Sequence, residues 1–286
     1  MSDFIKSPLN YVGGKFKTLP YLIPYLPKNP EFFVDLFCGG CNVGINTNSK
    51  KIIFNDINIF LIDMLKFFKY SDTNDILYQI EETILKYNIN KDNEKGYHIL
   101  RNDFNLSYDP IKLYVLICSS FNQRMRINTN YKYNSAFRKG LNGYNDKLKV
   151  KLSIFLNRLH SINCNFTNYD FEDMNNIPYN AFVYADPPYL ISNADYCYEG
   201  VKNWRWGIEK EISLLFFLDK LNNSGINFAL NNILTHHGKS NQILIDWSKK
   251  YNVINLNYQY GNFNSQSDKK NIKDTQEVLI TNYEIQ

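Results

Sequence analysis

The stretch FVDLFCGGCNVG, residues 33–44, decides the fold that we expect for the chain. Its first half is an apolar run typical of a buried strand, and the glycines that follow predict a turn whose backbone can approach a ligand closely. Asp56 lies about 20 residues after Asp35, at the end of the next predicted strand. In a Rossmann-like half, such a glycine turn holds a nucleotide-like ligand and the later acid binds its ribose. The pattern favours an adenosine-containing cofactor, although it lacks the dinucleotide spacing GxGxxG.

The rest of the chain extends this strand into an α/β sheet. Apolar runs bounded by turn residues predict buried strands at residues 32–37, 51–54, 181–185, 226–230, 253–256 and 278–281. Helices are predicted at residues 16–25, 57–70, 208–221 and 239–251. Because several helices lie between strands, a parallel-rich α/β sheet with helices packed against it is the expected architecture.

Residues 71–151 show a different pattern. Amphipathic periods predict three helices, and a polar, aromatic segment with glycines and no buried-strand pattern follows them. The helices are predicted at residues 75–87, 97–104 and 111–120. We therefore expect residues 71–151 to form an inserted, mostly helical second domain, and residues 1–70 and 152–286 to form the α/β domain.

Positive charge gathers in the last part of this insertion. Residues 119–151 contain eight Lys or Arg residues and one acidic residue, Asp146, whereas the net charge of the whole chain is only +4. Cations interleaved with Asn, Gln and Tyr supply phosphate contacts and donors for base edges. The segment favours a nucleic-acid partner, although a solvated charged face has a similar composition.

The residues Asp186-Pro187-Pro188-Tyr189 follow the predicted strand at 181–185. Ligands of an open α/β sheet lie at this carboxyl edge, and two prolines fix the turn so that Asp186 and a backbone carbonyl point into the crevice beside Tyr189. Two acceptors that hold the hydrogens of an exocyclic amine free its lone pair for attack on an electrophilic methyl. We therefore expect methyl transfer to a flipped-out nucleobase, although two prolines can also simply end a strand.

Two other motifs have competing interpretations. Residues 38–41 have the CxxC spacing of a redox dithiol or of half a zinc site, but there is no second CxxC and the four His are scattered, so we expect no metal. Residues 10–15, NYVGGK, lack the first glycine of a phosphate loop and the Ser or Thr after its lysine. They predict a glycine turn before the helix at 16–25, where Lys15 and exposed N–H groups would suit a carboxylate.

The composition limits the class of protein. With 286 residues, of which 44% are hydrophobic, the chain can bury a sizeable core. No apolar run approaches the roughly 18 residues of a membrane span, so we expect no membrane partner. The odd number of cysteines, five, fits a reducing compartment, and we expect a cytoplasmic protein.

Taken in order along the chain, these motifs resemble the Dam-type, adenine-N6-specific DNA methyltransferases. The resemblance covers residues 10–15, 33–44, 55–58, 186–189, 228–232 and 277–283, with the basic insertion between them. It implies a Rossmann-like methyltransferase with a mixed seven-stranded sheet and a helical target-recognition domain. It also implies S-adenosyl-L-methionine as the cofactor and the N6 amine of a flipped-out adenine in double-stranded DNA as the acceptor.

The resemblance assigns roles to residues by position. The catalytic set is Asp186, Pro187, Pro188 and Tyr189. The cofactor-binding set is Tyr11, Gly13, Lys15, Asp35, Phe37, Gly39, Asp56, Asp170, Phe171 and Asp186. The DNA-binding set in the recognition segment is Arg124, Arg126, Asn128, Arg138 and Lys139. Cys41 stands where the family usually has glycine, and this departure bears on how tightly the cofactor loop closes. Asn231 stands where serine is common, and this departure matters less.

The resemblance also implies partners: a restriction-modification system with a cognate endonuclease for the same sequence, and a monomer or weak dimer. Two alternatives remain, a cytosine-N4 DNA methyltransferase and a catalytically inactive DNA-binding subunit of the same fold. The site as a whole depends on Asp186. We expect Asp186 to face a cleft that it shares with Asp56 and to be free of any buried salt bridge.

Overall fold

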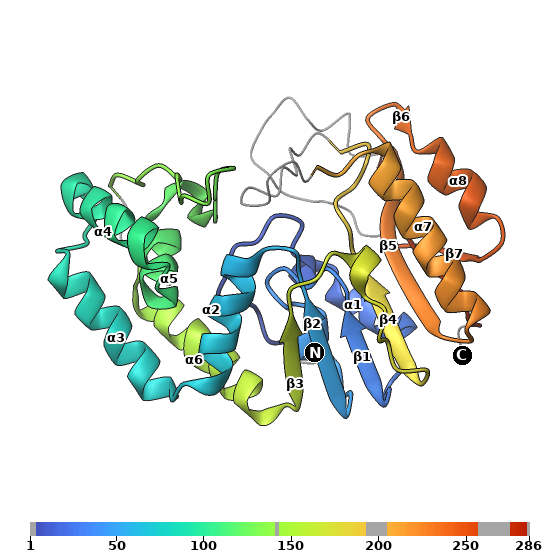
Figure 1. The fold of residues 1–286 in the computed structure, drawn as a ribbon, viewed down its shortest axis with the longest axis horizontal. Helices are drawn as coiled ribbons and strands as arrows, with labels where there is room; N and C mark the ends of the chain where they lie inside the picture. The colour runs from blue at the N-terminus through green and yellow to red at the C-terminus, as the bar shows by residue number, and fades with distance from the viewer. Residues whose placement is uncertain (1–3, 141–142, 193–204, 257–274, 285–286) are drawn as a thin grey trace.

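The computed structural model describes residues 4–140, 143–192, 205–256 and 275–284 (Figure 1). Its sheet has the strand order β3-β2-β1-β4-β5-β8-β7, and a short β6 pairs with the end of β5. The strands are β1 (Phe32–Asp35), β2 (Lys51–Asn55), β3 (Cys164–Thr167), β4 (Ala181–Ala185), β5 (Asn227–His236), β6 (Lys239–Ser240), β7 (Asn252–Asn255) and β8 (Gln276–Thr281). Strands β1 to β5 pair in parallel, whereas β8 is antiparallel to both β5 and β7. The predicted mixed seven-stranded α/β sheet is confirmed, with β6 in addition.

Helices cover both faces of this sheet. The α-helices are α1 (Leu19–Leu22), α2 (Ile59–Tyr70), α3 (Thr73–Lys86), α4 (Glu94–Ser107), α5 (Pro110–Ser119), α6 (Asp146–Ser161), α7 (Ile208–Asn223) and α8 (Gln242–Ser248). Five short 3-10 helices are η1 (Lys15–Lys17), η2 (Ile23–Tyr25), η3 (Gly44–Asn46), η4 (Phe121–Gln123) and η5 (Phe171–Asp173). Side chains alternate along each strand, so Phe33 of β1 packs in one apolar cluster and Val34 in another with α7 and α8.

Several helices begin where the sequence supplies a capping side chain. Asn58, Asp72, Asp109 and Asn145 each accept a hydrogen bond from a backbone N–H in the first turn of α2, α3, α5 and α6, respectively. These side chains satisfy N–H groups that have no partner within the helix. The capping residues therefore fix where these four helices begin.

Helices α3, α4 and α5 form a lobe beside the sheet, and α6 returns the chain to it (Figure 1). One continuous apolar cluster joins Phe104 and Tyr114 of this lobe to Phe54 and Phe68 next to the sheet. Helix α6 spans residues 146–161, so the predicted division at residue 151 falls inside a helix. The division into two domains stays a prediction, and the two parts share one core.

Two predicted helices differ from those in the structure. The helix predicted at 16–25 is wrong as one continuous element, because Pro24 cannot donate an intrahelical hydrogen bond and the chain forms η1, α1 and η2 instead. The helix predicted at 239–251 begins only at Gln242. His237 and Gly238 both have positive φ, 48° and 77°, so the chain turns there into the hairpin of β5 and β6.

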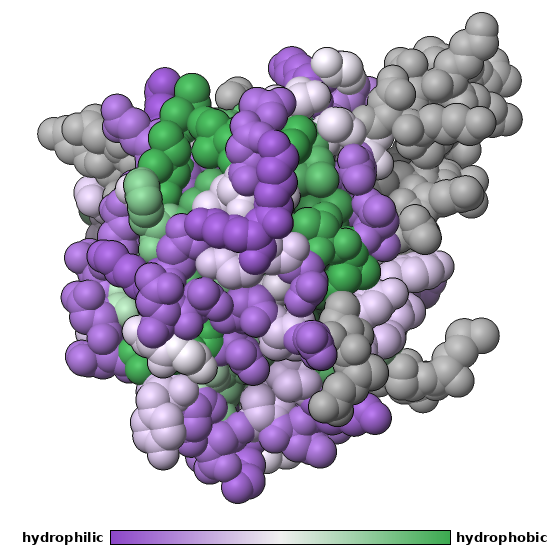
Figure 2. Space-filling model, turned by 90° about the vertical axis from the view of Figure 1, so that its right-hand side faces the viewer, coloured by the Kyte–Doolittle hydropathy of each residue, from purple (hydrophilic) through white to green (hydrophobic). Residues whose placement is uncertain are grey.

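Figure 2 looks onto the side of the molecule that carries α7, α8 and β7, where polar and apolar side chains are interspersed. The outer face of α7 includes Ile208, Ile212 and Phe216 as exposed apolar residues. Among the described helices, none combines the length and the apolar character needed to cross a membrane.

The glycine turn after β1 generates a first prediction. A Cβ added at Gly44 would lie 2.5 Å from Phe54 Cε1 and 3.0 Å from Asp35 Oδ2, so Gly44→Ala must displace the β2 side chain. We expect the free energy of unfolding to fall by about 2 kcal/mol in urea titrations, as for other overpacked cores. At Gly207 an added Cβ meets nothing within 4 Å. Equal losses in Gly44→Ala and Gly207→Ala would contradict the packing argument.

Candidate active site

A cleft opens at the carboxyl ends of β1 and β4. Three turns line it: residues 10–15, the glycine turn after β1 and the turn after β4. The predicted site residues on its lining are Tyr11, Gly13, Lys15, Asp35, Phe37, Gly39, Arg124, Arg126, Asp186, Pro187, Pro188 and Tyr189. The predicted residues outside its lining are Asp56, Asp170, Phe171, Asn128, Arg138 and Lys139. The neighbouring parallel strands β1 and β4 thus bring the two predicted motifs to one edge of the sheet.

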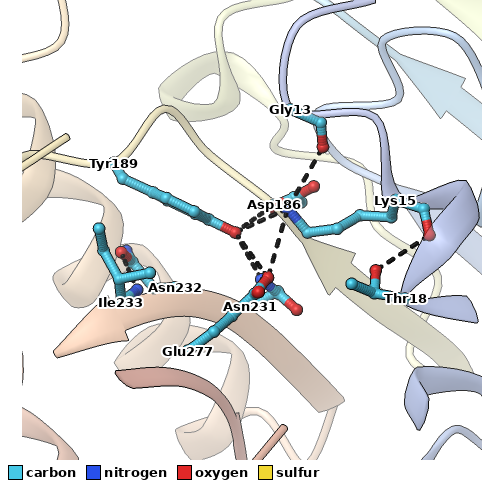
Figure 3. Close-up of polar contacts among 9 residues, drawn as sticks. All are labelled: Gly13, Lys15, Thr18, Asp186, Tyr189, Asn231, Asn232, Ile233 and Glu277. Atoms are coloured by element: carbon cyan, nitrogen blue, oxygen red, sulfur yellow. Dashed lines mark hydrogen bonds and ion pairs between the residues drawn. The ribbon is translucent and has the colours of Figure 1, made fainter. Parts of the chain in front are cut away.

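Lys15 joins the N-terminal turn to the turn after β4 (Figure 3). Its side chain is only 7% exposed, and its Nζ lies 2.9 Å from Asp186 Oδ1. The same Nζ donates a hydrogen bond of 2.7 Å to Tyr189 Oη and one of 3.3 Å to Gly13 O. Tyr189 Oη lies 3.1 Å from Asp186 Oδ1. The ammonium therefore fixes the acidic and aromatic residues of the turn relative to each other.

The ion pair corrects the expectation that Asp186 is free of a buried salt bridge. Asp186 is 15% exposed at its side chain and pairs with Lys15, so that part of the expectation is wrong. Asp186 still lines the cleft, as predicted, together with Asp35. Burial raises the pKa of Asp186 above its usual value, while the Lys15 ammonium acts in the opposite direction. In this structure one oxygen of Asp186 is therefore occupied by Lys15 and Tyr189.

Asp35 and Asp56 hold the glycine turn. Asp35 Oδ2 accepts a hydrogen bond of 3.0 Å from Gly44 N, and burial raises its pKa to about 7. Asp56 Oδ2 accepts a hydrogen bond of 3.0 Å from Gly39 N, and its Oδ1 accepts one of 2.9 Å from Asn58 N. Burial raises the pKa of Asp56 to about 6. Because Asp56 lies outside the lining of the cleft, the expectation that Asp186 and Asp56 share its wall is wrong, and the ribose role of Asp56 stays a prediction.

The two cysteines of the CxxC spacing are buried free thiols. Burial raises the pKa of both Cys38 and Cys41. A redox dithiol requires a thiolate at moderate pH, so these environments do not favour that interpretation. Cys41 has a φ of 62°, the left-handed region that favours glycine. Among the described residues there is no group of three or more His, Cys, Asp or Glu placed to hold a metal ion.

An aromatic group adjoins the cleft at Phe37. The ring centroid of Phe37 lies 5.7 Å from the ring centroid of Phe171 and 5.7 Å from that of Trp206. Asp170, next to Phe171, forms a 2.7 Å ion pair with Lys210. Phe171 and Asp170 are therefore near the predicted cofactor wall, and their roles toward the cofactor stay predictions.

The predicted DNA-binding residues divide into two groups. Arg124 and Arg126 lie on the lining of the cleft, beside the turn that carries Asp186. Asn128 Oδ1 instead accepts hydrogen bonds of 3.0 Å from the backbone N–H groups of Asn130 and Lys132, which leaves it less suited to a base. Elsewhere in the basic segment, Lys149 pairs with Glu81 at 2.5 Å. Part of the positive charge is therefore paired with an acidic side chain of the protein itself.

The backbone at Arg124 is held by three hydroxyl groups. The carbonyl of Arg124 accepts hydrogen bonds from Ser135 Oγ at 2.9 Å, Ser120 Oγ at 3.2 Å and Tyr133 Oη at 3.2 Å. All three donor residues are buried. The segment that carries both arginines is thus fixed against the mouth of the cleft.

Sequence reasoning assigned no site role to several residues that the structure places there. Tyr184 and Met125 line the cleft, and the Tyr184 hydroxyl has no hydrogen-bond partner among the described atoms. Asn231 Nδ2 donates to Tyr189 Oη at 2.5 Å and to Glu277 Oε1 at 2.9 Å. Glu277 could have been found as the one acid in the otherwise apolar run at 277–280, because a buried carboxylate requires a partner.

A Rossmann-like sheet that carries a glycine turn and an Asp-Pro-Pro-Tyr turn at one edge defines a methyltransferase class. A family model described as D12 class N6 adenine-specific DNA methyltransferase matches residues 11–262. The chain belongs to this family. The predicted family is therefore confirmed.

Several curated relatives are similar along the chain. The Type II methyltransferase M.FokI of Planomicrobium okeanokoites is 42% identical over 99% of this chain, and the modification methylase StsI of Streptococcus sanguinis is 40% identical over 98%. A DNA adenine methylase of Haemophilus influenzae is 23% identical over 72% of this chain and 71% of its own length. The chain spans only 43% of the length of M.FokI and of StsI.

The buried acid of the glycine turn generates a second prediction. Because the pKa of Asp35 rises from 3.8 to about 7 on folding, its protonated form stabilises the fold. That contribution is complete below about pH 4 and is lost as the pH rises to about 7. The free energy of unfolding of the wild type, minus that of Asp35→Asn, should therefore decrease as the pH rises from about 4 to about 7. The decrease is at most about 1.4 kcal/mol per pH unit. Urea unfolding at several pH values measures this difference, and a constant difference would contradict it.

Proposed function

We propose that this chain transfers the methyl group of S-adenosyl-L-methionine to the N6 amine of a flipped-out adenine in duplex DNA. The main support for the proposal is that Asp186, Tyr189 and the glycine turn after β1 line the same cleft. Family membership supports the same reaction. The cysteines described by the structure are free thiols, which supports a reducing, cytoplasmic setting.

The residues of the cleft fit this cofactor by their chemistry. Asp35 and Asp186 place carboxylates where a cationic sulfonium and an ammonium group would be stabilised. Tyr11 and Phe37 supply aromatic faces on the same lining. A Cβ at Gly39 would lie 2.7 Å from Tyr11 Cδ1, so glycine at this position, with its φ of 45°, allows the loop to close on the Tyr11 ring. When bound, the cofactor supplies the electrophilic methyl group.

The turn after β4 would prepare the adenine amine. Asp186 and a backbone carbonyl of the turn would accept the two amine hydrogens, which directs the lone pair of N6 away from the ring and toward the methyl group. Tyr189 would stack against the extruded base. The cleft excludes part of the solvent, which strengthens these interactions.

The basic recognition segment would hold the duplex at the mouth of the cleft. Arg124 and Arg126 combine positive charge with a backbone fixed by buried hydroxyl groups, so we place them on the phosphates next to the flipped base. Arg138 and Lys139 lie farther from the lining and would contact phosphates. We infer a role for Asn128 in closing the turn before Lys132 rather than in reading a base.

We further propose that the chain is part of a modification methylase in a restriction-modification system with a cognate endonuclease. The similarity to M.FokI, a Type II methyltransferase, and to StsI, a modification methylase, supports this proposal. Sequencing plasmid DNA for modified adenines after expression of the chain would test the activity and identify the target sequence.

Removing the Asp186 carboxylate tests the proposed reaction. We expect Asp186→Ala to lower the rate of methyl transfer by at least about 100-fold, because an acceptor for the amine hydrogens is lost, while DNA affinity stays within several-fold. Nucleoside analysis of the product separates N6-methyladenine from N4-methylcytosine. Asp246→Ala, an exposed substitution on α8, is the control. Full activity of Asp186→Ala would refute the assigned role.

The position of Arg126 predicts a change in salt dependence. If Arg126 contacts a phosphate, Arg126→Ala should weaken binding to a duplex that contains the target and reduce the slope of log K against log salt by about 0.9. Lys249→Ala, directly after the C-terminal end of α8, is the control with the same loss of charge. Fluorescence anisotropy at several salt concentrations gives both slopes, and identical slopes would exclude a phosphate contact by Arg126.

A further inference from the structure

Glu277 is a buried carboxylate beside the Lys15–Asp186 ion pair (Figure 3). It lies on β8, where Val278, Leu279 and Ile280 are all buried and apolar. The Glu277 side chain is 3% exposed, and its Oε1 lies 3.7 Å from Lys15 Nζ. Lys15 is therefore close to two carboxylates, and in this structure it lies nearer to Asp186.

The ion pair with Lys15 competes with the proposed chemistry of Asp186 at one carboxylate oxygen, Oδ1. Lys15 Nζ and Tyr189 Oη both lie within hydrogen-bond distance of Asp186 Oδ1, so they occupy an oxygen that could accept an amine hydrogen. The Lys15 side chain is 7% exposed, so water cannot fully solvate the ammonium if it leaves Asp186. A buried ammonium without a carboxylate is strongly unfavourable. Release of Asp186 therefore requires another partner for Lys15.

Glu277 is held in place to provide that partner. Asn231 Nδ2, on the neighbouring strand β5, donates a 2.9 Å hydrogen bond to Glu277 Oε1. Tyr189 Oη lies 3.3 Å from Glu277 Oε1 and 2.7 Å from Lys15 Nζ, so it bridges the two groups. The ammonium needs to move by only about 1 Å to reach an ordinary charged hydrogen-bond length to Glu277.

We propose that Glu277 is a positioning residue that receives the Lys15 ammonium from Asp186 when the target base enters the cleft. The exchange replaces one ion pair by another, and no proton or covalent bond is transferred. It frees Asp186 Oδ1 for the adenine amine while Lys15 stays paired. The exchange itself involves only the side chains of Lys15, Asp186 and Glu277. Its consequence for catalysis rests on the proposed function.

A stability cycle tests the exchange without any methylation assay. Among the described residues, Glu277 is the carboxylate that stays next to Lys15 when Asp186 is replaced by Asn. Adding Glu277→Gln to Asp186→Asn should therefore lower Tm at least about twice as much as it does in the wild type. Glu211→Gln removes another buried carboxylate, which is bonded to Trp206 and Asn241 and not to Lys15. Its effect on Tm should be the same in both backgrounds. Additive effects of Asp186→Asn and Glu277→Gln would overturn the proposal.

Single-turnover methylation tests the consequence for catalysis. Glu277→Gln should slow methyl transfer at least about tenfold with nearly unchanged Kd for DNA and cofactor, and Glu277→Asp should restore part of the rate. Unchanged transfer in Glu277→Gln would refute the positioning role. If the stability cycle shows coupling but the wild type methylates no DNA, the exchange of Lys15 stands and the proposed function fails.

Discussion

The ion pair between Lys15 and Asp186 connects the parts of this molecule on which its site depends. Lys15 follows a turn near the N-terminus, Asp186 follows β4, and Glu277 lies on β8. These segments meet because β1, β4, β5 and β8 are consecutive in the sheet, so one buried ammonium can contact carboxylates from opposite ends of the sequence. A charge buried in this way remains only where its partners are held precisely enough to compensate desolvation. The sheet provides that rigidity.

The strands that the sequence predicts well are those buried on both faces. β1 and β4 pair with parallel neighbours on both sides, so they appear as continuous apolar runs. β3 lies at an edge with Asn165 exposed, and its mixed composition hides it. Helix α6 was missed for a related reason, because its lysines suggested a charged recognition segment while Leu152, Phe155, Leu156 and Leu159 pack in the core. Composition therefore predicts secondary structure well for strands that are buried on both faces. It is misleading for strands and helices that have one exposed face.

In the candidate site, too, some features could be predicted from the sequence and others could not. Local motifs predict that the glycine turn and the turn after β4 share a cleft, because both follow neighbouring parallel strands. The partner of each charged side chain is not local: Lys15 and Tyr189 are 174 positions apart in the sequence. Asp56 and Asn128 show a second limit, since the side chains of both accept hydrogen bonds from backbone N–H groups that the sequence motifs do not identify as their partners. Residue type and spacing thus predict the place of the chemistry but not the pairing of its charges.

The apolar cluster that runs from Phe104 and Tyr114 into the sheet has an evolutionary consequence. A module joined by a flexible hinge can be exchanged between enzymes as a unit, but this helical lobe is fused to the sheet through shared packing. Grafting a foreign helical lobe would require rebuilding the interior around α2 and α6. New sequence preferences in such a lineage would therefore arise by changes to side chains around the cleft mouth, with the backbone beneath them inherited intact.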